Sequence, residues 1–132
     1  MGARIGQHFL NDENAAEQIV AASGARAGTK ILEIGPGRGA LTKGLVASGA
    51  AVTAVEMDER LHDRVARDFG PRVRLIRSDF LKLDLAELSE TPYVVVANLP
   101  YAVGTPILQR LLTWDGWSEA VLMFQKEVAD RI

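Results

Sequence analysis

The sequence predicts an α/β fold with a mostly parallel sheet flanked by helices. Short apolar segments alternate with amphipathic ones along the whole chain, and the glycine-rich residues 35–39 join the first apolar segment to a helix. Hydrophobic residues make up 48% of the 132 residues and charged residues 24%, which is typical of a globular domain. Strands separated by helices of this length need right-handed crossovers, which make the strands parallel. We therefore expect a single domain over residues 1–132, with about five strands.

The first half of the chain predicts three helices and two strands. In chain order these are a helix over residues 11–23, a strand over 30–34, a helix over 40–48, a strand over 51–56 and a helix over 58–69. Their ends carry local signals: Asn11 or Asp12 can cap the first helix and Asp58 the third, while Gly49 can end the second. The third helix is amphipathic, with apolar residues at a spacing of four.

The second half predicts three strands and shorter helices. The expected elements are a strand over residues 73–76, a helical turn over 83–88, a strand over 93–97, a helix over 105–112, a strand over 119–124 and the opening of a helix over 125–132. Arginines interleave with the apolar residues of 73–76, which indicates an edge strand. The continuous apolar run of 93–97 is typical of a strand buried on both faces.

The glycine loop predicts a nucleotide-type ligand. Gly35 and Gly37 would let the backbone approach a ligand closely at the carboxyl end of the sheet. A dinucleotide is one alternative, because the spacing of Gly35, Gly37 and Ala40 satisfies the loose fingerprint for it. Two details favour S-adenosylmethionine. Glu33 supplies a carboxylate near where the methionine ammonium would lie, and Pro36 removes a backbone N–H that a pyrophosphate would use.

Carboxylates end the next two strands. Glu56 lies about 20 residues beyond the loop, the position of a carboxylate that accepts both ribose hydroxyls. Its neighbour Met57 is assigned to the same cofactor site. Asp79 can accept from an adenine amino group while Phe80 packs on the ring, although an Asp after a strand is often only a helix cap.

The tetrapeptide Asn98-Leu99-Pro100-Tyr101 predicts methyl transfer to a nitrogen of a planar base. An amide oxygen and a backbone carbonyl can accept both N–H groups of an exocyclic amine and favour a localised lone pair. Proline fixes the backbone that aims these acceptors, and an aromatic ring can stack on the base. The alternative is a strand end followed by a proline turn.

Six motifs occur in an order that resembles the rRNA adenine N6-dimethyltransferase family. They are Gly6-Gln7-His8-Phe9-Leu10, Glu33-Ile34-Gly35-Pro36-Gly37, Glu56, Asp79, Asn98-Leu99-Pro100-Tyr101 and Gln125-Lys126-Glu127-Val128. The resemblance covers almost the whole chain. Leu99 and the tail after Phe124 favour the bacterial small-subunit branch over the macrolide-resistance branch, which acts on large-subunit rRNA.

The resemblance implies a Rossmann-like class I methyltransferase core that uses S-adenosylmethionine and releases S-adenosylhomocysteine. His8 and Leu10 would line the methionine side of the cofactor, although His8 departs from the asparagine frequent there. Asn98 and the Leu99 carbonyl would receive the target amine, and Tyr101 would stack on the flipped base. The implied partner is small-subunit rRNA or a ribosomal subunit precursor. No strong base is needed, because the product ammonium loses its proton to water.

The resemblance also implies that residues 1–132 form a catalytic core without the family's last strands and C-terminal RNA-binding domain. On that basis we expect the strand over residues 119–124 to form an apolar exposed edge. The net charge of −2 shows no overall basic character. A stripe of arginines that could contact phosphate is interleaved with acids, so we expect the chain alone to methylate RNA poorly. The stripe consists of Arg60, Arg64, Arg67, Arg72, Arg74 and Arg77.

Composition argues against several other classes. The chain has no cysteine, its two histidines form no metal-ligand pattern, and no apolar stretch approaches the roughly 20 residues of a membrane span. We expect a cytoplasmic monomer without a metal. Two alternatives remain open: an NAD-dependent oxidoreductase half-domain, which has no account of residues 98–101, and a module that binds cofactor or a ribosome precursor without catalysis.

Overall fold

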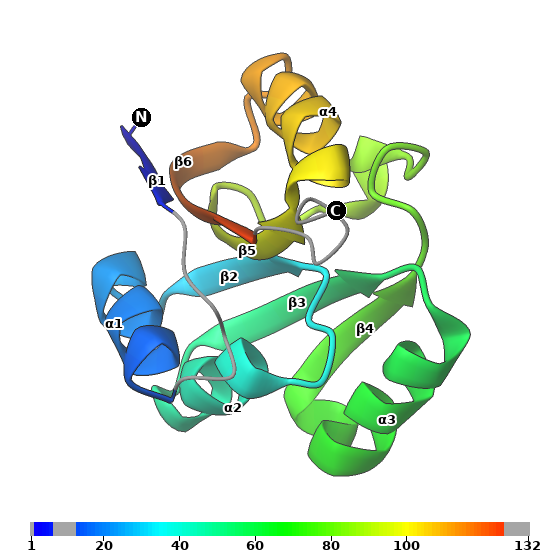
Figure 1. The fold of residues 1–132 in the computed structure, drawn as a ribbon. Coiled ribbons are helices and arrows are strands. Elements are labelled where there is room, and N and C mark those ends of the chain that lie inside the picture. The colour runs from blue at the N-terminus through cyan, green and yellow to red at the C-terminus, as the bar shows by residue number, and fades with distance from the viewer. Residues whose placement is uncertain (1, 7–12, 126–132) are drawn as a thin grey trace, which may run out of the picture.

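The computed structural model describes residues 2–6 and 13–125, with side chains described over 14–100 and 102–124. Within these residues, six strands form one sheet with helices on both faces (Figure 1). The strands are β1 (Gly2–Gly6), β2 (Lys30–Ile34), β3 (Ala51–Glu56), β4 (Val73–Arg77), β5 (Tyr93–Pro100) and β6 (Trp117–Gln125). The helices are α1 (Glu13–Ser23), α2 (Ala40–Ala47), α3 (Glu59–Phe69) and α4 (Tyr101–Leu112), with 3-10 turns at Gly70–Arg72 and Leu85–Glu87.

The sheet has the order β1-β6-β5-β2-β3-β4, and every neighbouring pair is parallel. From β2 the chain builds outward through β3 to β4, then returns to place β5 on the other side of β2. The strand order therefore reverses between β2 and β5. In open α/β sheets, ligands bind in the crevice at the carboxyl ends of the strands at this switch point.

Two apolar layers sandwich the sheet. On one face, Ile31 and Val96 pack with residues of α1 and α2 such as Ile19 and Leu45. On the other face, residues including Leu32, Val95 and Leu122 pack with Leu111 of α4. Figure 1 shows α1, α2 and α3 on one side of the sheet and α4 on the other. Because alternate residues of a strand point to opposite faces, these layers fix where each polar side chain at the carboxyl edge projects.

Most predicted elements are confirmed, and their ends differ from the prediction by no more than four residues. Asp58 caps α3 as expected, since its Oδ1 accepts the backbone N–H groups of Arg60 and Leu61 at 2.9 and 3.2 Å. β4 lies at the edge of the sheet, as its arginines indicate. The predicted caps Asn11 and Asp12, and the helix expected beyond residue 125, lie outside the described residues.

Two predictions about strands are wrong. The first missed β1, which pairs in parallel with β6 from Gly2 to Gly6, so β6 is an inner strand and not the expected exposed edge. The second ended β5 at residue 97. β5 instead continues to Pro100, which pairs with Gln125, and α4 begins directly at Tyr101. Proline fits because it ends the strand and starts the helix, where a missing N–H costs little.

Candidate active site

Three polar side chains project from the carboxyl edge of the sheet on the face that α1 and α2 cover. Residues two apart in a strand point to the same face of the sheet. Glu33 therefore shares a face with Ile31 in β2, Glu56 with Ala54 in β3, and Asn98 with Val96 in β5. All three apolar neighbours belong to the α1–α2 core layer. Glu33 pairs with Val96 across β2 and β5, so Asn98 lies two residues, roughly 7 Å, further along its strand. The switch point therefore carries two carboxylates and an amide on one face.

Glu33 is buried with only part of its hydrogen-bonding capacity used. Its Oε1 accepts the Thr42 hydroxyl at 2.5 Å, while its Oε2 has no hydrogen-bond partner among the described residues. Burial raises the pKa of Glu33 to about 7, an effect that the Thr42 hydrogen bond reduces and the Glu56 carboxylate increases. A buried acid with a free oxygen is suited to receive a cationic donor, which would hold it in the charged form.

Asn98 presents a second unpartnered acceptor. Its Oδ1 is buried and has no hydrogen-bond donor among the described residues. An unsatisfied buried carbonyl oxygen costs roughly 1–3 kcal/mol, which folding alone gives no reason to accept. Glu33 Oε2 and Asn98 Oδ1 lie on adjacent strands on either side of the switch point, so they fit a ligand or substrate that brings N–H donors.

The glycine loop owes its sequence to backbone conformation. Gly35, Gly37 and Gly39 all have positive φ angles, of 70°, 58° and 89°. A side chain is strained there at every one of the three positions. Gly39 also packs closely, because a Cβ atom built on it would lie 2.9 Å from Cε2 of Phe69. The three glycines thus make a tight turn from β2 into α2 and bring the loop backbone to the switch point.

Glu56 holds this loop from the neighbouring strand. Its Oε1 accepts the N–H of Gly37 at 3.0 Å, and its Oε2 accepts the N–H of Asp58 at 2.9 Å. The residue is buried, with 6% of its surface exposed. Because each carboxylate oxygen has two lone pairs, both oxygens can still accept one hydroxyl donor. The position predicted for a ribose ligand is therefore a preorganised double acceptor.

Most backbone N–H groups of the glycine loop already donate hydrogen bonds to acceptors within the protein. The Gly35 N–H donates to the Val55 carbonyl at 2.9 Å, the Gly37 N–H to Glu56, and the Gly39 N–H to the Pro36 carbonyl at 2.9 Å. Proline has none to give. A pyrophosphate needs free N–H groups, and here it would also meet the Glu56 carboxylate. The loop is therefore poorly suited to a dinucleotide.

Asp79, Phe80 and Met57 surround the outer part of the same edge. Asp79 Oδ1 accepts the N–H of Leu81 at 2.9 Å, which is the capping role considered from the sequence, and no described partner of its Oδ2 is seen. Phe80 is 3% exposed and belongs to the core on the α4 side, so its ring has little free surface for stacking on a base. Met57 is 61% exposed beside Glu56 and offers an apolar surface to a ligand there.

The remaining predicted site residues are only partly described. Leu99 is buried with 4% exposure, and its Cδ2 lies 3.6 Å from a Cβ atom built on Gly35, so it supports the loop from β5. Pro100 is exposed and precedes the first residue of α4, Tyr101, whose side chain is not described. His8 and Leu10 lie outside the described residues.

Two contacts at the site were missed from the sequence. The sequence places Thr42 only in a helix, yet in the structure its hydroxyl donates to Glu33. Arg110 was not considered, yet its guanidinium reaches the backbone carbonyls of Phe80 and Leu83. Neither contact has a sequence spacing that marks it.

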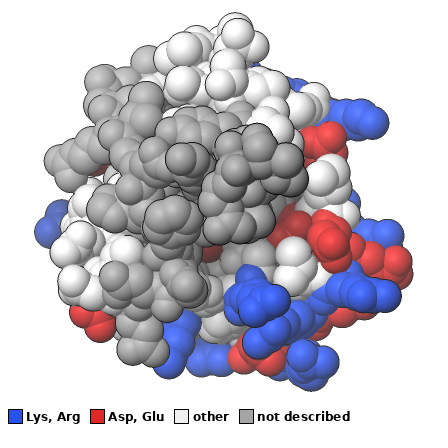
Figure 2. Space-filling view, in the orientation of Figure 1, with Lys and Arg blue, Asp and Glu red and all other residues white. Residues whose placement is uncertain are grey.

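Three of the six arginines in the predicted stripe lie beside acids. Arg64 and Arg67 each lie 3.7 Å from Asp68, and Arg77 lies 3.4 Å from Glu59. Figure 2 shows the same mixture of basic and acidic side chains over this part of the surface. Exposed pairs of this kind contribute little to stability, but they reduce the free positive charge available to phosphate.

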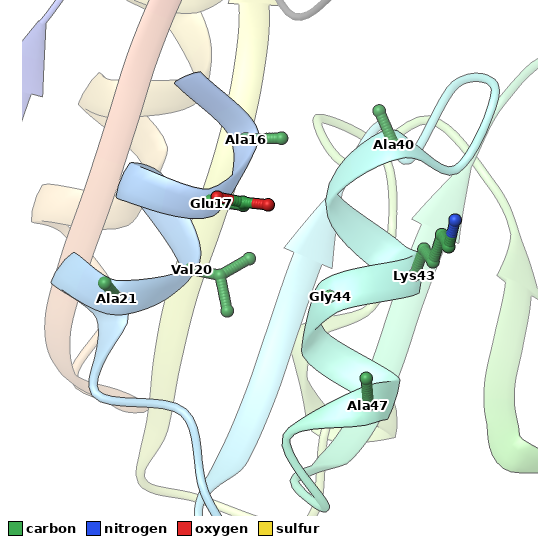
Figure 3. A pocket seen from close by; sticks show the side chains of 8 residues that line it. All are labelled: Ala16, Glu17, Val20, Ala21, Ala40, Lys43, Gly44 and Ala47. Carbon is green, nitrogen blue, oxygen red and sulfur yellow. The ribbon is translucent and has the colours of Figure 1, made fainter. Parts of the chain in front are cut away.

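A hollow of about 480 Å³ lies between α1 and α2 and is lined by residues of these two helices. Figure 3 shows small side chains from both helices facing it, with Glu17 and Lys43 among the lining residues. None of the predicted site residues lines this hollow. Among the residues described, no group of acidic and histidine side chains could hold a metal, and no helix is both long and apolar enough to cross a membrane.

The family model described as "Ribosomal RNA adenine dimethylase" matches residues 2–132. A "Ribosomal RNA small subunit methyltransferase A" from Erythrobacter litoralis is 44% identical over 135 residues, covering 97% of this chain and 48% of the relative.

Two solved structures share the fold. The 23S rRNA methyltransferase ErmE matches with a TM-score of 0.75 and 26% identity, over 87% of this chain and 47% of that one. A dimethyladenosine transferase from Plasmodium falciparum matches with a TM-score of 0.71 and 27% identity, over 94% and 46%. The chain spans about half the length of the curated relatives it matches.

Proposed function

We propose a function from one premise: this chain belongs to the ribosomal RNA adenine dimethylase family. It forms the S-adenosylmethionine-binding core of an rRNA adenine N6-dimethyltransferase, which transfers methyl groups to N6 of adenosines near the 3′ end of small-subunit rRNA. The observation that carries this proposal is a pair of buried acceptors, Glu33 Oε2 and Asn98 Oδ1, which have no hydrogen-bond partner among the described residues and lie on the two strands that flank the switch point.

The cofactor site is assigned along the carboxyl edge of the sheet. Glu33 receives the ammonium of the methionine part, Glu56 accepts the ribose hydroxyls, and the free oxygen of Asp79 accepts the adenine amino group. Met57 offers its exposed side chain to one face of the adenine. Because the Phe80 ring is buried, we assign its backbone, not its ring, to the adenine site. The cofactor supplies an activated methyl group on its sulfonium.

The target amine is assigned to the end of β5. Asn98 Oδ1 and the Leu99 carbonyl accept its two N–H groups, which favours a lone pair localised on nitrogen. These acceptors lie where β5 pairs with β6, beyond the last pair of β5 with β2, and Pro100 connects them directly to α4. Catalysis then depends mainly on positioning, and the proton of the product passes to water.

The small-subunit substrate is favoured by the curated relatives over the large-subunit alternative. The chain is 44% identical to a small-subunit methyltransferase and 26% identical to ErmE, a 23S rRNA methyltransferase. We accordingly propose a ribosomal subunit precursor as the partner and the cytoplasm as the location, with the chain acting as a monomer.

The proposal is tested by calorimetry of this chain with S-adenosylhomocysteine and, separately, with NAD. We expect saturable binding of S-adenosylhomocysteine with a stoichiometry of one and no binding of NAD at the same concentrations. Transfer of tritiated methyl groups from S-adenosylmethionine to undermethylated small subunits, compared with large subunits, then tests the substrate. Binding of NAD alone, or label in large-subunit RNA only, would contradict the proposal.

A further inference from the structure

We propose that Arg110 of α4 is a positioning residue that fixes the turn over residues 79–83 and so sets Asp79 for recognition of the adenine ring. The role rests on the proposed function, because it assumes that Asp79 receives the cofactor's adenine amino group. Arg110 lies in α4, the helix that follows the target-base residues 98–101, whereas Asp79 follows β4 at the far edge of the sheet.

Arg110 makes three contacts with one short segment. Its Nη1 donates to the Phe80 carbonyl, its Nη2 donates to the Leu83 carbonyl at 2.6 Å, and its guanidinium carbon lies 5.6 Å from the centre of the Phe80 ring. A planar guanidinium presents its donors in a fixed fork, so two carbonyls bound at once are held relative to each other. The ring contact adds a cation–π attraction in a half-buried position.

The segment that Arg110 holds is a closed turn built around Asp79. The Asp79 carbonyl accepts the N–H groups of Lys82 and Leu83 at 2.9 and 3.0 Å, and its Oδ1 accepts the N–H of Leu81 at 2.9 Å. The side chain of Asp79 is therefore as fixed as the turn that contains it. Any shift of the turn therefore also moves Oδ2 of Asp79, the oxygen assigned to the adenine amino group.

The sheet alone gives this turn little support. It follows β4, which has only β3 as a neighbour among the described strands, and Ser78, the residue before the turn, donates its N–H to the Glu56 carbonyl at 3.1 Å. Phe80 and Leu83 of the turn pack in the same core cluster as Leu111 of α4, and Arg110 adds hydrogen bonds from α4 to this apolar packing. Arg110 thereby adds polar contacts between the adenine side of the site and the helix that follows the target-base residues.

The charge of Arg110 is directed at the turn and not at an acid. No described ion pair includes Arg110, so its removal leaves no buried carboxylate without a partner. Arg110→Met keeps much of the apolar stem and removes the two donors together with the charge over the Phe80 ring. Arg110→Lys keeps the charge but replaces the fork by a single ammonium.

The test compares S-adenosylhomocysteine with S-inosylhomocysteine, in which oxygen replaces the adenine amino group. The unaltered chain should bind the adenosine compound at least about 10-fold more tightly, because a charge-assisted hydrogen bond is lost in the inosine compound. In Arg110→Met this ratio should fall to about 3-fold or less, and in Arg110→Lys to an intermediate value. Amide hydrogen exchange at residues 81–83 should accelerate in Arg110→Met.

Arg74→Met is the matched control. Arg74 also donates to a backbone carbonyl, that of Glu87 at 3.2 Å, but outside the turn over residues 79–83. Arg74→Met should leave the ratio of the two affinities unchanged. If Arg110→Met does not fold, the affinity ratio measured for Arg110→Lys tests the positioning role instead. An unchanged ratio in the folded variants, or an equal loss of affinity for both compounds, overturns the positioning role alone. Failure of the unaltered chain to bind either compound overturns the proposed function and this role together.

Discussion

Thr42 of α2 and Glu33 of β2 are joined by a hydrogen bond of 2.5 Å, in which the Thr42 hydroxyl donates to Oε1. It is the only hydrogen bond to the Glu33 side chain among the described residues, and Oε2 remains without a partner. Burial accordingly raises the pKa of Glu33 to about 7, from an ordinary value of 4.5. The folded chain therefore binds a proton at Glu33 over a pH range in which the unfolded chain does not.

This difference predicts that Glu33 makes the unliganded chain less stable as pH rises. Between pH 4.5 and 7 the folded state holds more protons at this site than the unfolded state, so its contribution to the free energy of unfolding falls with pH. The total is about 3 kcal/mol. Glu33→Gln should match the unaltered chain near pH 5 and exceed its stability at pH 8, measured by urea unfolding. The exposed Glu17→Gln serves as control, and equal pH profiles for all three chains would contradict the argument.

Cofactor affinity should depend on pH in the opposite sense. The ammonium of S-adenosylhomocysteine needs the charged form of Glu33, so binding should expel a proton and tighten between about pH 5.5 and 7.5. The gain is at most tenfold per pH unit below the pKa of the free site. Calorimetry in two buffers of different ionisation enthalpy measures the released proton directly. Release that persists unchanged in Glu33→Gln would place the titrating group elsewhere.

Glu56→Ala should weaken binding of S-adenosylhomocysteine roughly 10- to 150-fold, since a charge-assisted hydrogen bond contributes about 1.5–3 kcal/mol. The variant also releases the N–H of Gly37, so part of the loss comes from a looser glycine loop. Glu59→Ala is the control, because Glu59 is a nearby exposed acid paired with Arg77. Unchanged affinity in a folded Glu56→Ala chain would remove Glu56 from the cofactor site.

The sequence predicted the parts of the fold that depend on local patterns. Apolar runs and glycine signals located five of the six described strands, and the positions of Glu33, Glu56 and Asn98 at strand ends placed them at one edge of the sheet. β1 was not predicted, because two of its five residues are glycines and its partner β6 is more than 100 residues away in the chain. No local periodicity records such a pairing.

The side-chain contacts of the site could not be predicted in the same way. That Glu56 would accept the Gly37 N–H, or that Arg110 would reach the Phe80 carbonyl, depends on how strands and helices register in three dimensions. The environment of the Phe80 ring could not be predicted from its residue type alone. An aromatic residue beside Asp79 suggested stacking on a base, yet core packing uses its ring.

Gly104→Ala should destabilise the chain by about 1–2 kcal/mol, although alanine is the better helix former. A Cβ atom on Gly104 would lie 2.1 Å from Cε1 of Phe124, a buried ring of β6. Gly44→Ala is the control, since its Cβ would meet one methyl of Val20 at 2.9 Å beside the hollow between α1 and α2, and we expect a change within about 0.5 kcal/mol. Urea unfolding measures both. Adding Gly104→Ala to Phe124→Leu should cost nothing further, and a full additional loss would refute the clash.

Asn98→Ala should separate stability from catalysis. The buried Oδ1 of Asn98 has no described donor, so its removal relieves a desolvation cost and should leave the free energy of unfolding equal or up to about 1 kcal/mol higher. A residue kept for folding would show the opposite sign. Gln109→Ala, which removes an exposed amide from α4, is the control for both measurements.

Methyl transfer in Asn98→Ala should fall by about 100-fold or more, because the lost interaction orients the target amine in the transition state. Affinity for S-adenosylhomocysteine should change far less, so the effect lies in the rate. Transfer is measured with tritiated S-adenosylmethionine on undermethylated small subunits. If residues 1–132 are inactive alone, the comparison is repeated after fusing the C-terminal half of a curated relative. A stable Asn98→Ala variant with near-normal turnover would mean that the unpartnered oxygen has no part in methyl transfer, whereas a rate loss with intact folding and binding assigns it to the substrate.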